Sequence, residues 1–499
     1  MPEVIGVVGA GTMGAGIAQL AAAAGARTLL HDPVPEARER GLAQIAEGLE
    51  RWRTKGRLER ESGAVAGVAE LDALAGAGLI IEAAPERLEL KRELFAAMSA
   101  VAPGAVLASN TSSIPITAIA SAAADPGRVV GMHFFNPAPI MALVEVIAGV
   151  DSSPDALDVA RATGRAMGKH VIDATDGPGF LVNRCNRPFG LEALKLLQER
   201  VADVETIDAI ARAAGFRMGP FELQDLVGID VGYEVSLSFH ALSFGEPRWR
   251  PSPLSARMVA AGRLGRKTGR GWYEYPRERP EDDAPAAPAG GEERLVVVAG
   301  ELAVAQELRG LAARAGFDAR DQDEVAGDVP WLLVDAGADP EGAPLQGGPV
   351  ALLCADGSLH ALDGGGAAVG FHVLPPLDDL PLVELTRGDG TAALAAERVE
   401  AFFAALGLRT AWVGDAPGLV LGRIVAQLVN EACFAVGEGV GSPEDVDAGM
   451  VLGLNHPRGP FAWCEAMGAE HVIAVLDGLR IELGEERYRT APLLRRLAT

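Results

Sequence analysis

The sequence predicts an α/β protein with an additional all-helical part, and it predicts that both parts occur twice in one chain. Apolar strands alternate with helical segments up to about residue 176. The apolar spacing is helical from Phe180 to about Tyr275, and the same short motifs return after residue 291. At 499 residues the chain is also too long for a single hydrophobic core, so several domains are expected.

The chain begins with a strand, a glycine-rich turn and a helix. Residues 4–8 form a short β-branched strand, and Gly9, Gly11 and Gly14 follow at once. In such a turn the first glycine permits a tight bend, the second lets the backbone approach a pyrophosphate, and the third lets the helix pack closely on the strand. An alanine-rich helix over residues 17–24 and a strand over residues 27–32 complete the unit.

Asp32 is expected at the C-terminal end of that second strand. A carboxylate there hydrogen-bonds the ribose hydroxyls of adenosine and repels a 2′-phosphate, which favours NAD over NADP. A glycine motif alone is weak, but strand, glycines, helix, strand and terminal acid in this order are specific for a Rossmann-type domain. The residues of this unit predicted to bind NAD are Gly9, Gly11, Thr12, Met13, Gly14 and Asp32.

The rest of the first domain continues the same alternation. Helices are predicted over residues 36–51 and 89–100, and strands over residues 79–83, 105–108 and 129–133, which together predict a doubly wound parallel sheet. Asp176-Gly177-Pro178-Gly179-Phe180 then breaks the chain. We therefore expect a Rossmann-type NAD-binding domain over residues 1–176 and a helical substrate-binding or dimerisation domain over residues 177–276.

His133 and Glu145 form a candidate catalytic pair. Glu145 lies in an apolar run over residues 142–147 that predicts a buried strand, and His133 precedes it closely in the chain. A buried carboxylate needs a partner, and an imidazole is a suitable one. The carboxylate would fix the tautomer of the imidazole and stabilise the imidazolium that forms. We expect the histidine to act as a base beside the nicotinamide.

Composition and charge exclude several classes of partner. The formal net charge of −24 argues against nucleic acid and anionic membrane as general partners. The four cysteines are widely spaced, which suggests reduced thiols in a cytoplasm. Because the first strand begins at Val4 we expect no signal peptide, and because no apolar run is long enough we expect no membrane span. No metal site is predicted.

Motifs of the first half return with a constant shift. Glu145 returns as Glu384, and Pro178-Gly179-Phe180 returns as Pro417-Gly418-Leu419, each 239 positions later. A constant register over this length indicates a tandem duplication. The expected remaining segments are a linker over residues 277–293, a degenerate Rossmann-like domain over residues 294–413 and a second helical domain over residues 414–499.

The second copy differs from the first where chemistry would occur. After its first strand the phosphate-cradling glycines are missing. Asn136 and Asn183 of the first copy are Pro375 and Gly422 in the second, although His133 keeps a counterpart in His372. We therefore expect the second copy to keep the fold without binding the dinucleotide, and we expect its histidine to be catalytically silent.

Six motifs of the first copy together resemble those of a known family. They are Gly9–Gly14, Ser109-Asn110-Thr111-Ser112-Ser113, His133-Phe134-Phe135-Asn136-Pro137, Val144-Glu145-Val146, Pro178-Gly179-Phe180 with Asn183-Arg184, and Met218-Gly219-Pro220-Phe221. Residues 1 to about 275 resemble the L-3-hydroxyacyl-CoA dehydrogenase family. The second copy resembles the duplicated bacterial form of that family, the 3-hydroxyadipyl- or 3-hydroxybutyryl-CoA dehydrogenases of fatty-acid and aromatic-acid metabolism.

The resemblance implies the oxidation of an (S)-3-hydroxyacyl-CoA by NAD. It implies that His133 is the general base and Glu145 its partner. It further implies that Ser112 hydrogen-bonds the substrate oxygen and that Asn183 holds or polarises the carbonyl group. Considered alone, Ser112 fits a turn or a helix cap as well as catalysis, and Asn183 fits a bridge between helices.

The resemblance also places further residues near the two coenzymes. Those implied near NAD are Glu86, Lys91, Asn110, Asn136 and Lys267. Considered alone, Glu86 and Lys91 also fit an ordinary surface ion pair at a helix start, Asn110 fits a strand-end turn, and Lys267 fits a solvated charge.

Coenzyme A carries phosphates, so this acidic chain needs a local basic patch to bind it. The basic residues at the end of the helix after Asp32 are Arg51, Arg53, Lys55 and Arg57. The resemblance implies that Lys55 contacts the coenzyme. A solvated face explains such a cluster equally well.

Two other functions remain open from the sequence. One is a dehydrogenase of a free 3-hydroxy acid, since related folds share the glycine motif, and the other is a non-catalytic scaffold. The resemblance implies subunits that pair through their helical domains, so residues 414–499 are expected to pack on residues 177–275 and to replace a partner subunit. A homodimer of the whole chain is also compatible with the sequence.

Overall fold

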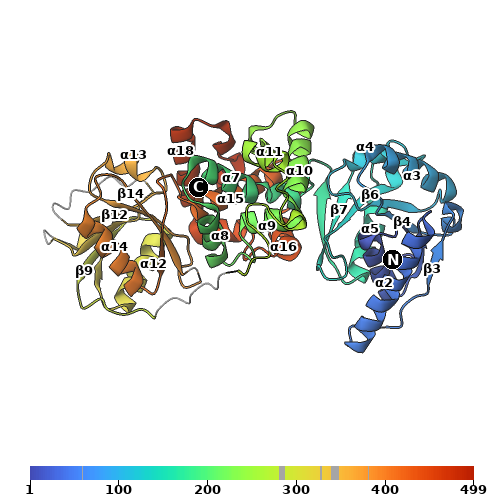
Figure 1. Cartoon of the computed structure of the whole chain (residues 1–499), viewed down its shortest axis with the longest axis horizontal. Helices are drawn as coiled ribbons and strands as arrows, with labels where there is room; N and C mark the ends of the chain where they lie inside the picture. Colours follow the sequence, from blue (N-terminus) through green and yellow to red (C-terminus); the bar gives the residue numbers. More distant parts are fainter. Residues whose placement is uncertain (59, 280–286, 326–328, 339–347, 380) are drawn as a thin grey trace. The chain divides into compact units, whose positions relative to one another are not determined.

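The computed structural model describes residues 1–58, 60–279, 287–325, 329–338, 348–379 and 381–499 (Figure 1). They form two compact units, Met1–Arg184 with Glu438–Leu454 and Cys185–Gly437 with Asn455–Thr499. Part of the predicted linker, residues 280–286, lies outside the described residues. Within the described ranges no helix has the length and apolar character needed to cross a lipid bilayer.

An eight-stranded sheet in the order β3-β2-β1-β4-β5-β6-β7-β8 forms the centre of the first unit. Its strands are β1 (Val4–Val8), β2 (Arg27–His31), β3 (Val65–Val68), β4 (Leu79–Glu82), β5 (Val106–Ser109), β6 (Val129–Phe134), β7 (Leu143–Ala148) and β8 (His170–Thr175). The order 3-2-1-4-5-6 of its first part is that of a dinucleotide-binding Rossmann fold, which confirms the predicted fold class.

The predicted parallel sheet is confirmed as far as β6, and the next strand, β7, departs from it. This strand runs antiparallel to β6, and β8 is parallel to β7. The connection between β6 and β7 covers only residues 135–142. A parallel crossover needs a dozen or more residues, so this short connection can join only antiparallel neighbours. As a result, the start of β7 lies beside the end of β6.

Helices α1 (Thr12–Ala23), α2 (Pro35–Thr54) and α5 (Pro154–Ala166) pack on the sheet through one apolar cluster. Helix α3 (Leu88–Val101) contacts β5, and α4 (Ile116–Ala120) contacts β6. The predicted elements differ from these mainly at their ends. Helix α1 begins directly after Gly11 rather than at residue 17, and β2 ends one residue before Asp32.

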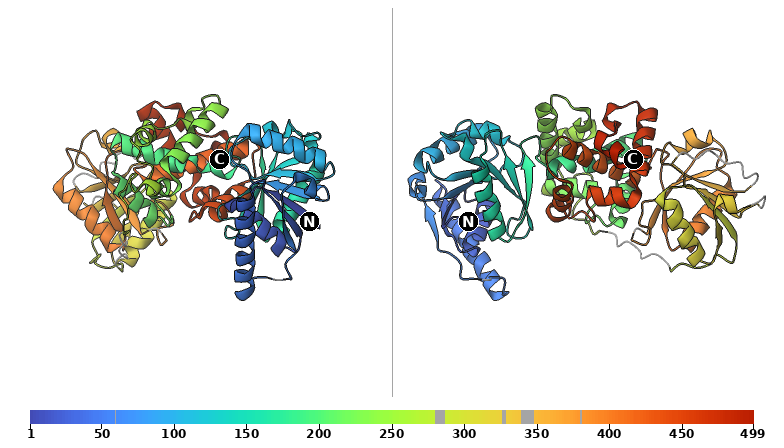
Figure 2. Two further views of the ribbon diagram at one scale, coloured as in Figure 1. Left: turned by 45° about the vertical axis from the view of Figure 1, so that its right-hand side comes forward. Right: turned by 180° about the vertical axis from the view of Figure 1, so that it is seen from behind.

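The second unit contains helices from both copies. Those of the first copy are α7 (Arg187–Glu199), α8 (Val204–Ala213), α9 (Pro220–Val227), α10 (Ile229–Leu242) and α11 (Pro253–Ala260). Those of the second copy are α15 (Leu421–Gly437), α17 (Pro460–Met467), α18 (Ala469–Leu483) and α19 (Pro492–Leu497). Helices α7 and α15 pack against each other, and the green and red helices lie together in both views of Figure 2.

The second unit also holds a second sheet, in the order β10-β9-β11-β12-β13-β14-β15. Its strands are β9 (Leu295–Ala299), β10 (Asp318–Arg320), β11 (Leu332–Asp335), β12 (Val350–Leu353), β13 (Val369–His372), β14 (Leu382–Arg387) and β15 (Arg409–Trp412), with helices α12 (Ala303–Arg314), α13 (Leu359–Asp363) and α14 (Ala393–Ala405). Among the described residues this order repeats the first sheet without a counterpart of β3, which confirms the duplicated fold.

Candidate active site

His133 and Glu145 face each other across the antiparallel pair β6–β7. The Nδ1 atom of His133 lies 2.6 Å from Oε2 of Glu145, and the two residues are 6 % and 0 % exposed. With the carboxylate on Nδ1, the proton belongs on that nitrogen, and Nε2 is left as the acceptor. The ring also packs against Phe135, at 4.6 Å between centroids. The short connection between the strands therefore creates a buried, oriented imidazole.

Backbone amides hold the second carboxylate oxygen of Glu145. Leu181 and Val182 donate their N–H groups to Oε1 at 3.2 and 3.0 Å. They follow a turn in which Gly179 and Phe180 both have positive φ, 70° and 52°. A phenylalanine in this region is strained, and such strain is common where a backbone is positioned for function. Sequence reasoning missed these two amides, although the Pro-Gly-Phe break marked the turn.

The second copy repeats this carboxylate cradle. Glu384 accepts the N–H groups of Val420 and Leu421, at 2.6 and 2.9 Å. Burial raises the pKa of Glu384 to about 8, although the two amides partly oppose the shift. The buried side chain therefore keeps its proton at neutral pH.

The histidine of the second copy has a different partner. His372 Nε2 lies 3.0 Å from Nε2 of His471, and burial together with this neighbour lowers the pKa of His372 well below its usual range. A Cβ atom at Gly422 would lie 2.1 Å from Cε1 of His372. The ring therefore fills the volume that the Asn183 side chain needs in the first copy. Among the described contacts of the second copy the hydrogen-bonded His–Glu pair of the first has no counterpart, although both residues remain.

The glycine turn after β1 fits a dinucleotide. Gly9 has a φ of 102°, which disfavours a side chain there. A Cβ at Gly14 would lie 1.8 Å from the carbonyl oxygen of Gly9, so this position does not accept a side chain either. A Cβ at Gly11 would meet nothing within 4 Å, which leaves the turn open on the side where a pyrophosphate approaches. Thr12 is exposed and Met13 is partly buried at the start of α1.

Asp32 is fastened to this turn. Its Oδ2 accepts the N–H of Ala10 at 2.8 Å, and its Oδ1 accepts the N–H of Val34 at 3.0 Å. These bonds use one lone pair of each oxygen, and a carboxylate can accept about four hydrogen bonds. The side chain can therefore fix the turn and still accept ribose hydroxyls.

Lys91 and Glu86 belong to a network under the loop that carries Ser112. Lys91 is buried, with Nζ 2.7 Å from Oε1 of Glu82 and 3.4 Å from Oε2 of Glu86. Glu86 Oε1 accepts the N–H groups of Ser112 and Ser113 at 3.1 Å each. The interpretation of Glu86 and Lys91 as an ordinary surface pair therefore does not fit.

The charge of Glu86 is maintained by this network. Partial burial opposes its ionisation, but Lys91 and hydrogen bonds from Thr111, Ser112 and Ser113 outweigh burial and lower the pKa of its carboxyl group. Glu86 thus orders the loop from Thr111 to Ser113 as a charged acceptor. The contacts of Glu86 explain the position of Ser112. The contact of Glu86 with NAD stays a prediction.

The remaining predicted residues occupy different environments. Asn110 accepts the N–H of Phe134 through Oδ1 at 2.9 Å and so joins the ends of β5 and β6. Asn136 is exposed just after β6, and Asn183 is partly buried in α6 (Val182–Cys185) after the strained turn. Lys267 lies in the second unit, where its Nζ pairs with Asp230 at 2.6 Å. Its contact with NAD stays a prediction.

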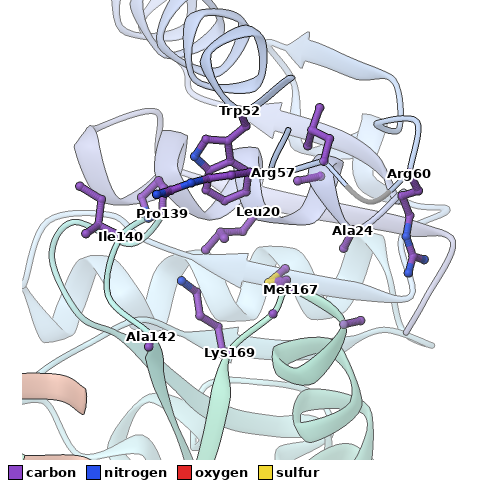
Figure 3. A pocket seen from close by; sticks show the side chains of 14 residues that line it. Leu20, Ala24, Trp52, Arg57, Arg60, Pro139, Ile140, Ala142, Met167 and Lys169 are labelled. Atoms are coloured by element: carbon purple, nitrogen blue, oxygen red, sulfur yellow. The ribbon is translucent and has the colours of Figure 1, made fainter. Parts of the chain in front are cut away.

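A basic cavity of about 320 Å³ lies in the first unit (Figure 3). Trp52 and Arg57 lie on one side of it and Lys169 on the other, and Arg60 also lines it. The Lys169 ammonium donates to the carbonyl oxygens of Ala138 and Met141, and burial lowers the pKa of this lysine to about 8. None of the described lining residues is acidic, so the cavity is suited to an anionic ligand.

The glycine turn and the acid after β2 meet the needs of a dinucleotide, and the oriented histidine meets those of a proton transfer. Together they define an NAD-dependent dehydrogenase. A family profile described as the NAD-binding domain of 3-hydroxyacyl-CoA dehydrogenase matches residues 4–177, and the profile of its C-terminal domain matches residues 179–275 and 418–499. The chain belongs to the 3-hydroxyacyl-CoA dehydrogenase family.

Similar proteins include both duplicated and single-copy members. The 3-hydroxyadipyl-CoA dehydrogenase of Escherichia coli is 35% identical over 99% of this chain and 97% of its own length. A probable 3-hydroxybutyryl-CoA dehydrogenase of Deinococcus radiodurans is 40% identical over 54% of this chain and 99% of its own length. A solved 3-hydroxybutyryl-CoA dehydrogenase of E. coli superposes with a TM-score of 0.83 at 34% identity, covering 100% of this chain and 98% of that one.

Proposed function

We propose that this chain catalyses the reversible oxidation of an (S)-3-hydroxyacyl-CoA to the 3-oxoacyl-CoA, with active chemistry in the first copy alone. The observation that carries the proposal is the buried pair of His133 and Glu145 at the end of β6. A base is useful there because parallel sheets bind dinucleotides at the carboxyl ends of their strands.

In this mechanism Nε2 of His133 removes the proton of the substrate's 3-hydroxyl group. The Glu145 carboxylate stabilises the resulting imidazolium and keeps Nε2 aimed at the substrate. NAD, held by the glycine turn and Asp32, would supply the hydride acceptor for C3, and loss of that hydride together with the hydroxyl proton would leave the 3-oxo group. In the reverse direction the protonated histidine is the acid. Ser112 and Asn183 hydrogen-bond the reacting oxygen, and the Glu86 network holds Ser112 in place.

The basic cavity is the proposed site for the phosphates of coenzyme A. Of the cluster predicted from sequence, Arg51 and Arg53 already pair with Glu47 and Glu50 on the surface of α2. Lys55 is exposed just beyond that helix and remains available to the coenzyme. The cationic groups that line the cavity are Arg57, Arg60 and Lys169.

Arg57→Ala and Arg60→Ala are each expected to raise the KM for acetoacetyl-CoA by about ten- to hundredfold, because one charge-assisted contact to phosphate is worth about 1.5–3 kcal/mol. The KM for a truncated thioester without the nucleotide, acetoacetyl-N-acetylcysteamine, should stay unchanged. Arg51→Ala is the matched control, since its guanidinium is already paired outside the cavity. Equal KM changes for the two thioesters would contradict the assignment.

The reaction class is tested by comparing acetoacetyl-CoA with free acetoacetate as oxidants of NADH. We expect turnover of the thioester and little of the free acid. Equal rates would favour the dehydrogenase of a free hydroxy acid, and a purified protein that fails to bind NADH would favour the scaffold. A panel of acyl-CoA esters of different lengths, with and without a terminal carboxylate, then defines the preferred acyl group of the substrate.

We also propose that residues 414–499 replace the helical domain of a partner subunit. Two ion pairs support this. Arg423 pairs with Glu199 in the second unit at 2.7 Å, and Arg184 pairs with Glu438 in the first unit at 2.8 Å. Both arginines and both glutamates are related by the shift of 239, so each copy supplies the arginine for the glutamate of the other. Such reciprocity is the mark of an isologous interface.

A further inference from the structure

One helix of the second copy lies in the compact unit that contains His133. Helix α16 (Pro443–Leu454) packs on β7 and β8 of the first sheet. Its buried residues follow a helical stripe and are Val446, Gly449, Met450 and Gly453. The two glycines are four residues apart, so they share one face and bring the helix backbone close to the first copy.

The neighbours of these glycines are residues that hold the His–Glu pair. A Cβ at Gly449 would lie 2.6 Å from Cγ2 of Val182, whose amide donates to Glu145. A Cβ at Gly453 would lie 2.8 Å from Leu143 and 3.3 Å from the ring of Phe135, which packs against the His133 ring. Helix α16 therefore contacts Val182, which holds Glu145, and Phe135, which packs against His133.

The segment leading into α16 is fixed to the same unit. Val440 accepts the N–H of Thr175, the last residue of β8, at 2.9 Å. A Cβ at Gly441 would lie 2.6 Å from Leu181, the other residue whose amide donates to Glu145. The helix thus enters at a defined position relative to the strained turn, and its contacts there leave little space for adjustment.

We propose that α16 of the second copy is a positioning element for His133 and Glu145, so that the copy without a cofactor site is required for catalysis by the other. This inference rests on the proposed catalytic roles of the pair. Val182 has two γ-methyl groups and a stiff side chain, so pressure on it from α16 moves its backbone rather than a flexible tip. A shift of that backbone weakens the hydrogen bond to Glu145 and reorients the imidazole.

The test is Gly449→Ala, assayed by NADH-dependent reduction of acetoacetyl-CoA. We expect kcat to fall by about tenfold or more, as expected for a misplaced general acid. The KM for NADH should remain unchanged, and the pH profile of kcat/KM should shift because the imidazole has lost its fixed carboxylate. The double variant Gly449→Ala/Val182→Ala makes room for the added methyl group and should recover most of the lost kcat.

Two control variants separate positioning from general destabilisation. Gly310→Ala in α12 adds the same methyl group where its nearest neighbour is 3.6 Å away, and it should leave kcat unchanged. Leu308→Ala removes a fully buried side chain from the second sheet domain and should lower stability with kcat retained. If Gly449→Ala does not fold, Gly453→Ala takes its place against Leu143 and Phe135.

A Gly449→Ala enzyme with unchanged kcat and pH profile would overturn the inference. So would an equal loss of kcat in the Leu308→Ala enzyme, or a double variant no better than the single one. An active His133→Ala enzyme would instead overturn the proposed function itself, which keeps the two failures distinct.

Discussion

His133→Ala should lower kcat for acetoacetyl-CoA reduction by about 10²–10⁴-fold, the usual contribution of a general acid or base. The substitution removes the only ring nitrogen that faces away from Glu145 in the buried pair. Binding of NADH, followed by its fluorescence, should change little, because the glycine turn and Asp32 are untouched. Circular dichroism of the variant checks that the fold is retained.

His372→Ala is the matched control from the other copy. His372 occupies the same register opposite Glu384, but its ring contacts His471 in a site without the glycine turn. We therefore expect wild-type kcat, with some loss of stability because the ring is fully buried. Loss of activity in this variant with retention in His133→Ala would reverse the assignment of the active copy.

Arg423→Met should lower the free energy of unfolding by about 3–5 kcal/mol, as expected when one partner of a buried ion pair is removed. Arg423 is 0% exposed, and its guanidinium contacts Glu192 at 2.5 Å, Glu199 at 2.7 Å and the Tyr488 hydroxyl at 2.8 Å. Its loss leaves Glu192 as a buried carboxylate without its cationic partner. Urea unfolding followed by tryptophan fluorescence measures the change.

Arg51→Met supplies the comparison on an exposed surface. Its ion pair with Glu47 lies on α2, where both side chains are more than half exposed, and such pairs contribute about 0–1 kcal/mol. A double variant Arg423→Met/Glu192→Met should be less destabilised than Arg423→Met alone, since no uncompensated charge remains. Equal stability losses for Arg423→Met and Arg51→Met would show that the buried network does not stabilise the interface.

Local patterns in the chain were sufficient to predict the cofactor domain. Gly9, Gly11 and Gly14 occur in one short stretch after a strand; Gly9 and Gly14 have steric reasons to be glycine, and Gly11 leaves the turn open toward a pyrophosphate. The partnership of His133 and Glu145 was also predictable, because two strands joined by a short connection bring their side chains opposite each other. The shortness of that connection also implies that β7 runs antiparallel to β6, which the alternation of strands and helices did not indicate.

Contacts between distant segments were not predictable in the same way. A surface ion pair was the alternative to the implied NAD contact of Lys91, yet this residue is 1% exposed because Glu82, within the preceding strand, provides a buried countercharge. The amides of Leu181 and Val182 carry no side-chain signature, since any residue can donate a backbone N–H. Gly449 and Gly453 read as ordinary helix glycines until the opposing surface is known. Each of these depends on a contact partner that the local sequence pattern does not reveal.

The reciprocal arginine–glutamate pairs have a consequence for how the enzyme tolerates dilution. Between separate subunits, such contacts would weaken as the protein concentration falls below the dissociation constant. Here Arg423 and Glu199 belong to one polypeptide, so their encounter is intramolecular and its effective concentration does not depend on how much protein is present. Because the two copies are fused, every catalytic first copy has one second copy as its partner. The second copy can therefore lose its catalytic residues without two inactive copies pairing with each other.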